Sequence, residues 1–251
     1  MANIINASKT STTGLVQTAD GSGVLQLQAD GVTGLTVGTG GVLTAANGIV
    51  MSLMTLGTAV AGEFEYDGRV PYFTPLGTQR GVLPGMQYYR LNSSLAGTNA
   101  LGNQSVFGKA VTLTGSTTYR YEFFISITKS AGTTSHAVTV AFTGTATLNN
   151  ISTSVLYTYN TVTPGVGSTN IAIGSYSSAS AIAGTAAMTA ASNQYICQGF
   201  GTVSINAGGT FIPNYNLSAA PGGAYSTDIG SYFLIYPIGA SGNDINVGTW
   251  A

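Results

Sequence analysis

The sequence predicts an all-β protein in which a short-stranded N-terminal β-repeat segment is followed by a C-terminal jelly-roll β-sandwich. The clearest observation is the stretch Thr117–Thr128, where large apolar side chains take every second position: Tyr119, Tyr121, Phe123, Ile125 and Ile127. Successive side chains of a strand point to opposite faces, so this pattern predicts a strand with one buried face. Further short alternating runs, separated by Gly, Pro or Asn turns, are typical of a sandwich or jelly roll.

The composition predicts a surface that other protein covers. Charged residues make up only 6% of the 251 positions, and the net charge is −1. This is too little charge for a nucleic-acid or anionic-membrane partner, and less than a monomer normally uses to stay soluble. We expect contacts with further copies or with a larger assembly; the alternative is a neutral secreted β protein.

Cysteine content and hydropathy exclude several classes. Cys197 is the only cysteine, so neither an intrachain disulfide nor a cysteine metal site is expected, and the thiol is predicted to be a small buried group. The N-terminus lacks the basic and apolar regions of a signal peptide. The most apolar stretch, Gly48–Gly62, is interrupted by polar residues and is too short for a membrane span.

Residues 1–62 carry a weak repeat of short apolar runs that end in Asp-Gly, at Asp20 and at Asp30. Such pairs are strong hairpin-turn signals. Very short strands become stable by stacking on neighbours, so we expect an attachment or shaft segment whose neighbour is another protomer. A β-meander packed on its own chain is the alternative. The candidates for docking on a larger particle are Leu15, Val16, Val24, Leu25 and Leu27.

Residues 63–86 are predicted to form a collar or linker. Phe64 and Tyr66 should lie on one strand face and three carboxylates on the other. Structural ion pairs, within one subunit or between subunits, are the expected role of the charged set: Glu63, Glu65, Asp67, Arg69, Arg80 and Arg90. Glycan cleavage by paired carboxylates and Ca²⁺ binding are the alternatives, and ion pairs are the commoner cause of such clusters.

Residues 87–251 are predicted to form the large domain. A strand over Val138–Leu148 should pair with the strand at Thr117–Thr128 and form one leaf of the sandwich, with a turn over 130–135 between them. Ala179–Ala191 is compatible with a short helix or a loop. The closing strand 231–238 is expected to place three side chains in the core or in a trimer contact: Tyr232, Leu234 and Tyr236.

The chain offers poor material for an enzyme. A triad would need His136 with Asp228 or Asp244 and a serine, and no Gly-x-Ser-x-Gly motif is present. His136 is expected to face solvent from a loop. Tyrosines could stack on sugars, with these candidates: Tyr157, Tyr159, Tyr215 and Tyr225. Core packing is the alternative for all four. We therefore predict a non-enzyme without a cofactor.

Several stretches resemble bacteriophage virion proteins of the fibre and decoration type, in particular their marine and cyanobacterial members. They are the N-terminal Thr13-Gly-Leu-Val-Gln-Thr-Ala-Asp-Gly run, Thr58-Ala-Val-Ala-Gly-Glu-Phe-Glu-Tyr-Asp-Gly with Thr78-Gln-Arg-Gly-Val, the strand at Thr117, Phe211-Ile-Pro-Asn-Tyr, and Gly230-Ser-Tyr-Phe-Leu-Ile-Tyr-Pro-Ile-Gly. The C-terminal half is also loosely similar to trimeric jelly rolls of the C1q/TNF type.

The resemblance implies a homotrimer in the virion, assembled in the host cytoplasm, with its N-terminal part docked on major capsid or tail proteins and its C-terminal domain outward. Head decoration, head fibre and tail fibre remain open. The first alternative is a receptor-binding fibre tip that recognises host surface polysaccharide. The second is a glycan-cleaving spike that uses Glu63 or Glu65.

Overall fold

The computed structural model describes residues 25–29, 32–37, 43–45, 48–51, 53–160, 169–242 and 244–250. These residues form strands, turns and loops, and no helix occurs among them. It follows that none of the described residues belongs to a helix long and apolar enough to cross a membrane. The chain divides into two compact units, Met1–Ser52 and Leu53–Ala251, whereas the sequence placed the first boundary after residue 62.

The first unit contains three short antiparallel strands in the order β1-β2-β3: Leu25–Ala29, Val32–Val37 and Leu43–Ala45. β1 and β2 pair with Ala29 opposite Val32, and the Asp-Gly pairs predicted as turns, at Asp20 and Asp30, lie outside the described residues. The docking candidates Leu15, Val16 and Val24 lie outside the described residues. Leu25 and Leu27 stand on β1, of which only the backbone is described.

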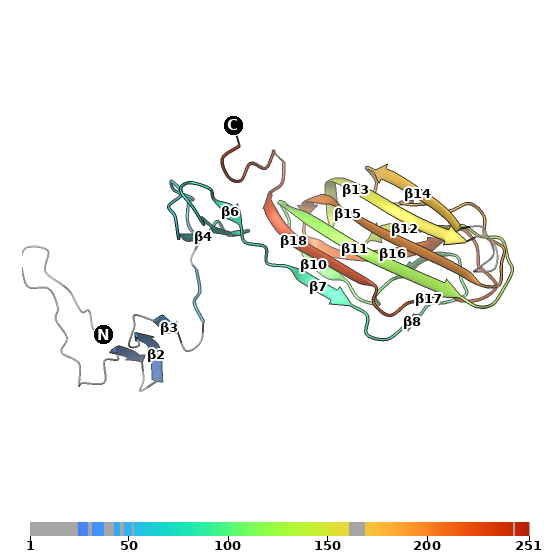
Figure 1. Ribbon diagram of the computed structural model, residues 1–251, viewed down its shortest axis with the longest axis horizontal. Coiled ribbons are helices and arrows are strands. Elements are labelled where there is room, and N and C mark those ends of the chain that lie inside the picture. The colour runs from blue at the N-terminus through green and yellow to red at the C-terminus, as the bar shows by residue number, and fades with distance from the viewer. Residues whose placement is uncertain are drawn as a thin grey trace, which may run out of the picture. The chain divides into compact units, whose positions relative to one another are not determined.

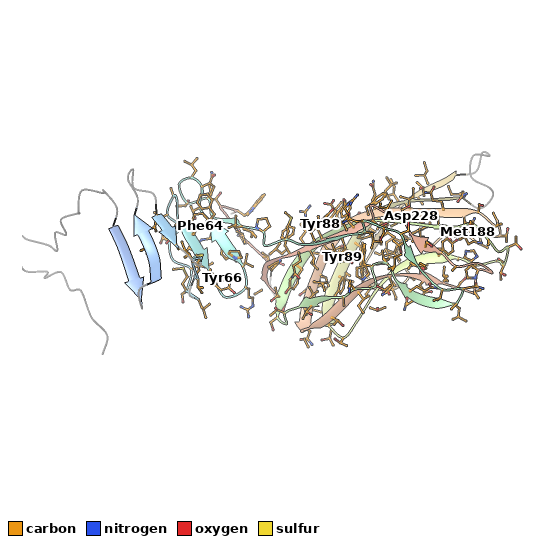
Figure 2. The ribbon with its side chains drawn as sticks, turned by 90° about the horizontal axis from the view of Figure 1, so that it is seen from below. Phe64, Tyr66, Tyr88, Tyr89, Met188 and Asp228 are labelled. Carbon is orange, nitrogen blue, oxygen red and sulfur yellow. The ribbon has the colours of Figure 1, made fainter. Side chains whose placement is uncertain are left out.

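The second unit begins with a small antiparallel sheet, β4-β5-β6: Phe64–Tyr66, Pro71–Phe73 and Gly81–Val82. It occupies most of the predicted collar. A three-residue strand can bury little, and this sheet leaves Phe64 more than half exposed, with its ring tilted against that of Phe73 at a centroid distance of 4.5 Å. Figure 2 labels Phe64 and Tyr66 on this sheet.

Most of the second unit is a β-sandwich. Its larger sheet runs β14-β13-β15-β11 and continues with β18 and β7 beside one half of β11 and with β17 and β8 beside the other (Figure 1). The bounds are Gln87–Arg90 (β7), Leu95–Ala96 (β8), Thr117–Lys129 (β11), Thr147–Asn160 (β13), Thr169–Tyr176 (β14), Asn193–Ala207 (β15), Ser226–Thr227 (β17) and Tyr232–Ala240 (β18). All pairs are antiparallel.

The smaller sheet runs β10-β16-β12, with β9 also paired to β16. Its bounds are Gly102–Ser105 (β9), Val111–Leu113 (β10), Val138–Thr143 (β12) and Gly209–Leu217 (β16). The Ala-rich segment lies along the edge of β12 that is not paired with β16. Backbone hydrogen bonds join Val140 to Ile182 there, and others join His136 to Met188. Ala181 and Ala183 have φ values of 56° and 55° there, so this segment forms an irregular edge and no helix.

The core lies between the two sheets and consists largely of aromatic rings. Tyr121 of β11 lies 5.3 Å from Phe142 of β12 and 6.0 Å from Phe233 of β18, and Phe142 stacks on Phe211 at 4.8 Å. The five alternate residues of β11 named from the sequence are all buried here, from Tyr119 to Ile127.

The predicted pairing of the strand at Thr117 with the strand at Val138 is wrong. β11 and β12 belong to different sheets and face each other across the core, so their apolar sides meet without sharing hydrogen bonds. β12 also ends at Thr143, because Gly144 adopts a φ of 126°, a conformation that favours glycine. The apolar residues after it, Ala146 and Leu148, flank and enter β13.

On the closing strand, the three residues expected in the core or in a trimer contact do not lie in the core. Phe233 and Ile235 fill the core of the sandwich, whereas Tyr232, Leu234 and Tyr236 lie partly exposed on the opposite face of the sheet. Both faces of β18 are apolar, so alternation alone could not choose between them.

Two glycines of β15 allow the rings of β11 to lie close against its backbone. Tyr121 pairs with Gly201 and Phe123 with Gly199. A Cβ at Gly201 would lie 2.0 Å from the Ser152 carbonyl oxygen and 2.7 Å from the Tyr121 hydroxyl. Backbone atoms cannot move away from such a contact without breaking the pairing of β13 with β15.

We predict that Gly201→Val lowers the free energy of unfolding by about 3 kcal/mol, because it overpacks a filled core. Gly85→Ala is the control, since a Cβ at Gly85 meets no atom within 4 Å, and it should change stability by less than about 0.5 kcal/mol. Urea unfolding followed by circular dichroism at one protein concentration measures both. Equal midpoints for the two variants would contradict this packing.

Candidate functional site

The outward face of the larger sheet is the main candidate site. On this face the strand register places Ile173, Leu156, Gln198, Phe124 and Tyr232 side by side across five strands. The neighbouring line across the sheet is Ser175, Ser154, Phe200, Glu122, Leu234 and Tyr88. Several of these outward positions carry apolar side chains, although the outward positions of a sheet that faces solvent are normally polar. We call these two lines, together with Ile171, the outer face.

Much of the outer face is uncovered. The exposed fractions are 69% for Ile171, 82% for Ile173, 36% for Leu156, 56% for Phe200 and 56% for Tyr88. At about 200 Å² for a large side chain, these five expose roughly 600 Å². That is at the upper end for the largest apolar patch of a monomer, about 300–600 Å². Further apolar side chains on this face are only half-buried, so the exposed apolar surface is larger still.

A groove of about 250 Å³ crosses this face between Leu156, Ile173, Phe200 and Tyr232. The carboxylate of Glu122 lines it and accepts a hydrogen bond of 2.8 Å from the Tyr232 hydroxyl. This bond, together with burial, raises the pKa of Tyr232 to about 12, so the phenol keeps its proton at neutral pH. The groove can hold apolar side chains of another protein, with a carboxylate at its base.

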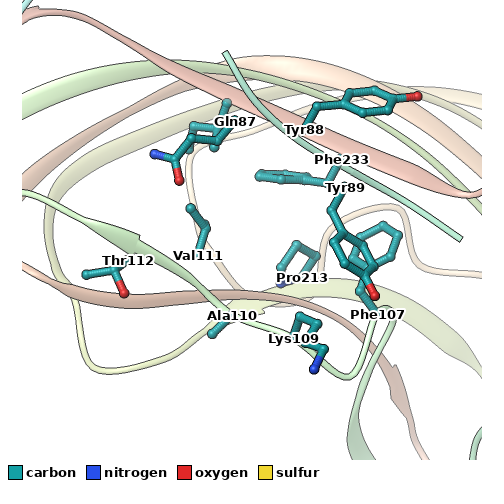
Figure 3. A pocket seen from close by; sticks show the side chains of 11 residues that line it. Gln87, Tyr88, Tyr89, Phe107, Lys109, Ala110, Val111, Thr112, Pro213 and Phe233 are labelled. Atoms are coloured by element: carbon teal, nitrogen blue, oxygen red, sulfur yellow. The ribbon is translucent and has the colours of Figure 1, made fainter. Parts of the chain in front are cut away.

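A second cavity of about 340 Å³ opens at one edge of the sandwich, where β7 and β10 each have a partner on one side only (Figure 3). Tyr89 and Phe107 form one wall, with their rings edge to face at 5.7 Å. Pro213 and Phe233 line its interior, and Lys109 lies at its mouth. The cavity has the size of a small-ligand pocket and an apolar lining.

The predicted collar charges are used within the small sheet. Arg80 donates two hydrogen bonds to Glu65, of 2.5 and 2.8 Å, and a third to the Gly57 carbonyl at 2.8 Å. Asp67 accepts from the backbone amides of Arg69 and Val70 and from the Tyr72 hydroxyl. On β4 the carboxylate side is the buried one, because Glu65 is buried with its partner whereas Phe64 is exposed.

The other collar residues make separate contacts. The Glu63 carboxylate accepts from the Val60 amide at 3.3 Å, and the Arg90 guanidinium donates to the Asn92 side chain. The Arg69 side chain is exposed. The three carboxylates thus bind different partners and converge on no shared centre. Among the residues that the structure describes, no group of three or more His, Cys, Asp or Glu could hold a metal ion.

His136 is buried, which corrects the expectation of a solvent-facing loop. Its Nδ1 lies 2.8 Å from the Thr134 carbonyl and its Nε2 lies 2.8 Å from the Tyr225 hydroxyl. The carbonyl can only accept, so Nδ1 carries the proton and Nε2 accepts from Tyr225. Asp228, the proposed triad partner, instead accepts from Ser126 and Thr128. The structure does not bring these groups together as a triad.

The tyrosines named for sugar stacking lie mostly in the core. Tyr157, Tyr215 and Tyr225 are buried, and Tyr159 is half-buried, with its hydroxyl oxygen accepting a hydrogen bond of 3.1 Å from the Ala186 backbone amide. The exposed pair is Tyr88 and Tyr89 of β7 (Figure 2). A run of two aromatic residues on an edge strand could have indicated them, because one of the two must point outward.

Comparison with known proteins gives no relative: no protein-family model matches the chain, and no curated protein matches its sequence. We therefore infer function from the surfaces described above.

We predict that His136 makes stability fall on acidification. Burial lowers the pKa of its imidazole below the ordinary value of 6.5, against the opposing effect of the Thr134 hydrogen bond. The folded state therefore favours neutral histidine, and stability is complete above pH 6.5 and is lost as the pH falls below it. Between pH 7.5 and 5, unfolding midpoints in urea should decline more steeply for the wild type than for His136→Gln. Parallel declines would show that His136 does not titrate on unfolding.

Proposed function

We propose that this chain is a non-enzymatic structural subunit of a bacteriophage virion, a capsid decoration or a head or tail fibre, and that it works as a homotrimer. The observation that carries the proposal is the apolar outer face. Stable interfaces bury about 800 Å² on each partner, and the outer face with its half-buried margin approaches that area. A subunit that functions alone has no use for such a surface.

The strand pairing supports a jelly roll as the finer description of the sandwich. β7 pairs with β18, β10 with β16 and β11 with β15, and β12 is bridged by residues 179–188. β7, the first strand of the sandwich, thus pairs with β18, its last strand. Each following pair lies in the sequence between the two members of the pair before it, which is the order of strand pairs in a jelly roll. The hairpin β13–β14 then extends the larger sheet as an insertion before residues 179–188.

The virion assignment rests on the sequence resemblance, and the small amount of charge is compatible with it. We propose that the N-terminal repeat docks on major capsid or tail proteins and that the sandwich points outward. The exposed Phe64 of the small sheet is a further apolar position that neighbouring copies would cover.

We predict a wild-type native mass near three times 25.4 kDa, and a monomer mass for Phe200→Asp, because the new carboxylate would be buried without a partner. Ile229→Asp is the matched control: Ile229 is 58% exposed, almost the same as Phe200, but lies in the loop before β18. It should leave the mass unchanged. Native mass spectrometry measures all three masses. If Phe200→Asp remains a trimer, the outer face is not the contact between subunits.

The second candidate function is a fibre tip that recognises host surface polysaccharide. It is favoured by the exposed Tyr88 and Tyr89 beside the edge cavity, with Gln87 and Lys109 as polar groups at its rim. An aromatic ring with a polar tip suits sugar stacking. Glycan-array binding by the full chain, lost at least about tenfold in Tyr89→Ala and kept in Ile229→Asp, would establish this function. If the wild type binds no glycan on the array, the glycan-binding function is wrong and only the structural role remains.

A further inference from the structure

Two opposite charges lie on the outward side of β11: Glu122 belongs to the outer face, and Arg120 lies on the next line across the sheet, at the margin of that face. Arg120 and Glu122 are two residues apart on β11, the central strand, and both side chains are exposed. The register places Arg120 between Thr202 and Tyr236 and Glu122 between Phe200 and Leu234. The charged pair is therefore surrounded by residues that are polar without charge or apolar.

The two charges do not neutralise each other within one chain. Side chains two positions apart on a strand are separated by about 6.6 Å, and no ion pair joins them. Glu122 binds the Tyr232 hydroxyl. Among the described residues, the Arg120 side chain has neither a hydrogen bond nor an ion pair with any group.

Two further charges beside this face are engaged within the chain. Arg90, at the edge strand, donates to Asn92, and Asp228, at the end near β17, accepts from Ser126 and Thr128. Asp244 lines a pocket with Thr118 and Thr202 beyond Arg120. Arg120 and Glu122 are the exposed charges of β11 itself that a protein lying over the outer face and its margin must accommodate. A buried charge without a partner is strongly unfavourable, so any such partner must offer a carboxylate to Arg120 and a cation to Glu122.

We propose that the partner over this face is a second copy of the chain, and that Arg120 of one copy pairs with Glu122 of the next. This inference rests on the proposed self-assembly and names the contact that fixes its register. The face carries one charge of each sign at adjacent outward positions, so it is complementary to itself. An apolar sheet face without such a pair would slide between registers, whereas like charges brought together by a wrong register repel.

Charge reversal with mixing tests the pair. Arg120→Glu gives a copy with two neighbouring carboxylates on the outward side of β11, and Glu122→Arg gives a copy with two guanidinium groups there. Each variant alone should self-associate at least about tenfold more weakly than the wild type. In an equimolar mixture, a trimer that contains both variants has two contacts between opposite charges and one between like charges, so the mixture should assemble more strongly than either variant alone. The double variant Arg120→Glu with Glu122→Arg should assemble by itself.

The control is Lys109→Glu, which makes the same change of charge as Arg120→Glu at an exposed position on the sandwich edge and should not alter assembly. Native mass spectrometry of isotopically distinguished variants, at low and high salt, reads out the composition of the complexes. Recovery in the mixture also shows that both variants are folded.

The outcomes separate this pair from the proposed function. If the wild type assembles and Phe200→Asp does not, but the single charge reversals assemble as the wild type does, the ion pair is wrong and the apolar interface stands. Variants that fail singly and also fail in the mixture would likewise overturn the pairing. A monomeric wild type would overturn both proposals.

Discussion

The burial of aromatic rings between the two sheets is the constraint on which the rest of the sandwich depends. Tyr121 and Phe123 project from the central strand, and the glycines opposite them on β15 leave room for rings where a Cβ would collide. Phe142 of the other sheet meets Tyr121 at 5.3 Å. Because the inward positions of β11 are fixed by this packing, the alternate positions are forced outward, and the composition of the outer face follows from that register.

The scarce charges of this chain are used mainly in holding the fold together. Glu65 and Arg80 are joined in a bidentate, largely buried pair. The buried ammonium of Lys129 donates to the carbonyls of Gly132 and Ala190, at 2.7 and 2.9 Å, and burial lowers its pKa. Charges committed to the interior cannot keep a surface solvated. The exposed apolar side chains of the large sheet therefore have few charged neighbours of the kind that usually discourage association, with Arg120 and Glu122 of β11 as exceptions.

The sequence predicted the all-β class and the inward face of β11, because large apolar residues alternate there with polar ones and Phe124 is the one break in the pattern. It could not predict which strands pair, since hydrogen-bonded neighbours and strands facing across a core show the same alternation, and β12 belongs to the second kind. It missed the burial of His136, because the Tyr225 hydroxyl that satisfies its Nε2 comes from a distant segment. It missed the burial of Glu65 for the same reason, as Arg80 is fifteen residues away.

The partial exposure of Tyr232, Leu234 and Tyr236 on β18, three residues that alternation also allowed in the core, has a physical meaning. Alternation identifies the inward face only when the other face is polar, and here Tyr232, Leu234 and Tyr236 made the outward face look like a core. The same ambiguity recurs on β14, where Ile171 and Ile173 are outward and strongly exposed. A strand that is apolar on both sides within a sheet covered on one side only has a second surface to bury. The apolar outward side of these strands, which made their core residues ambiguous in the sequence, is thus also the observation that favours an assembled protein.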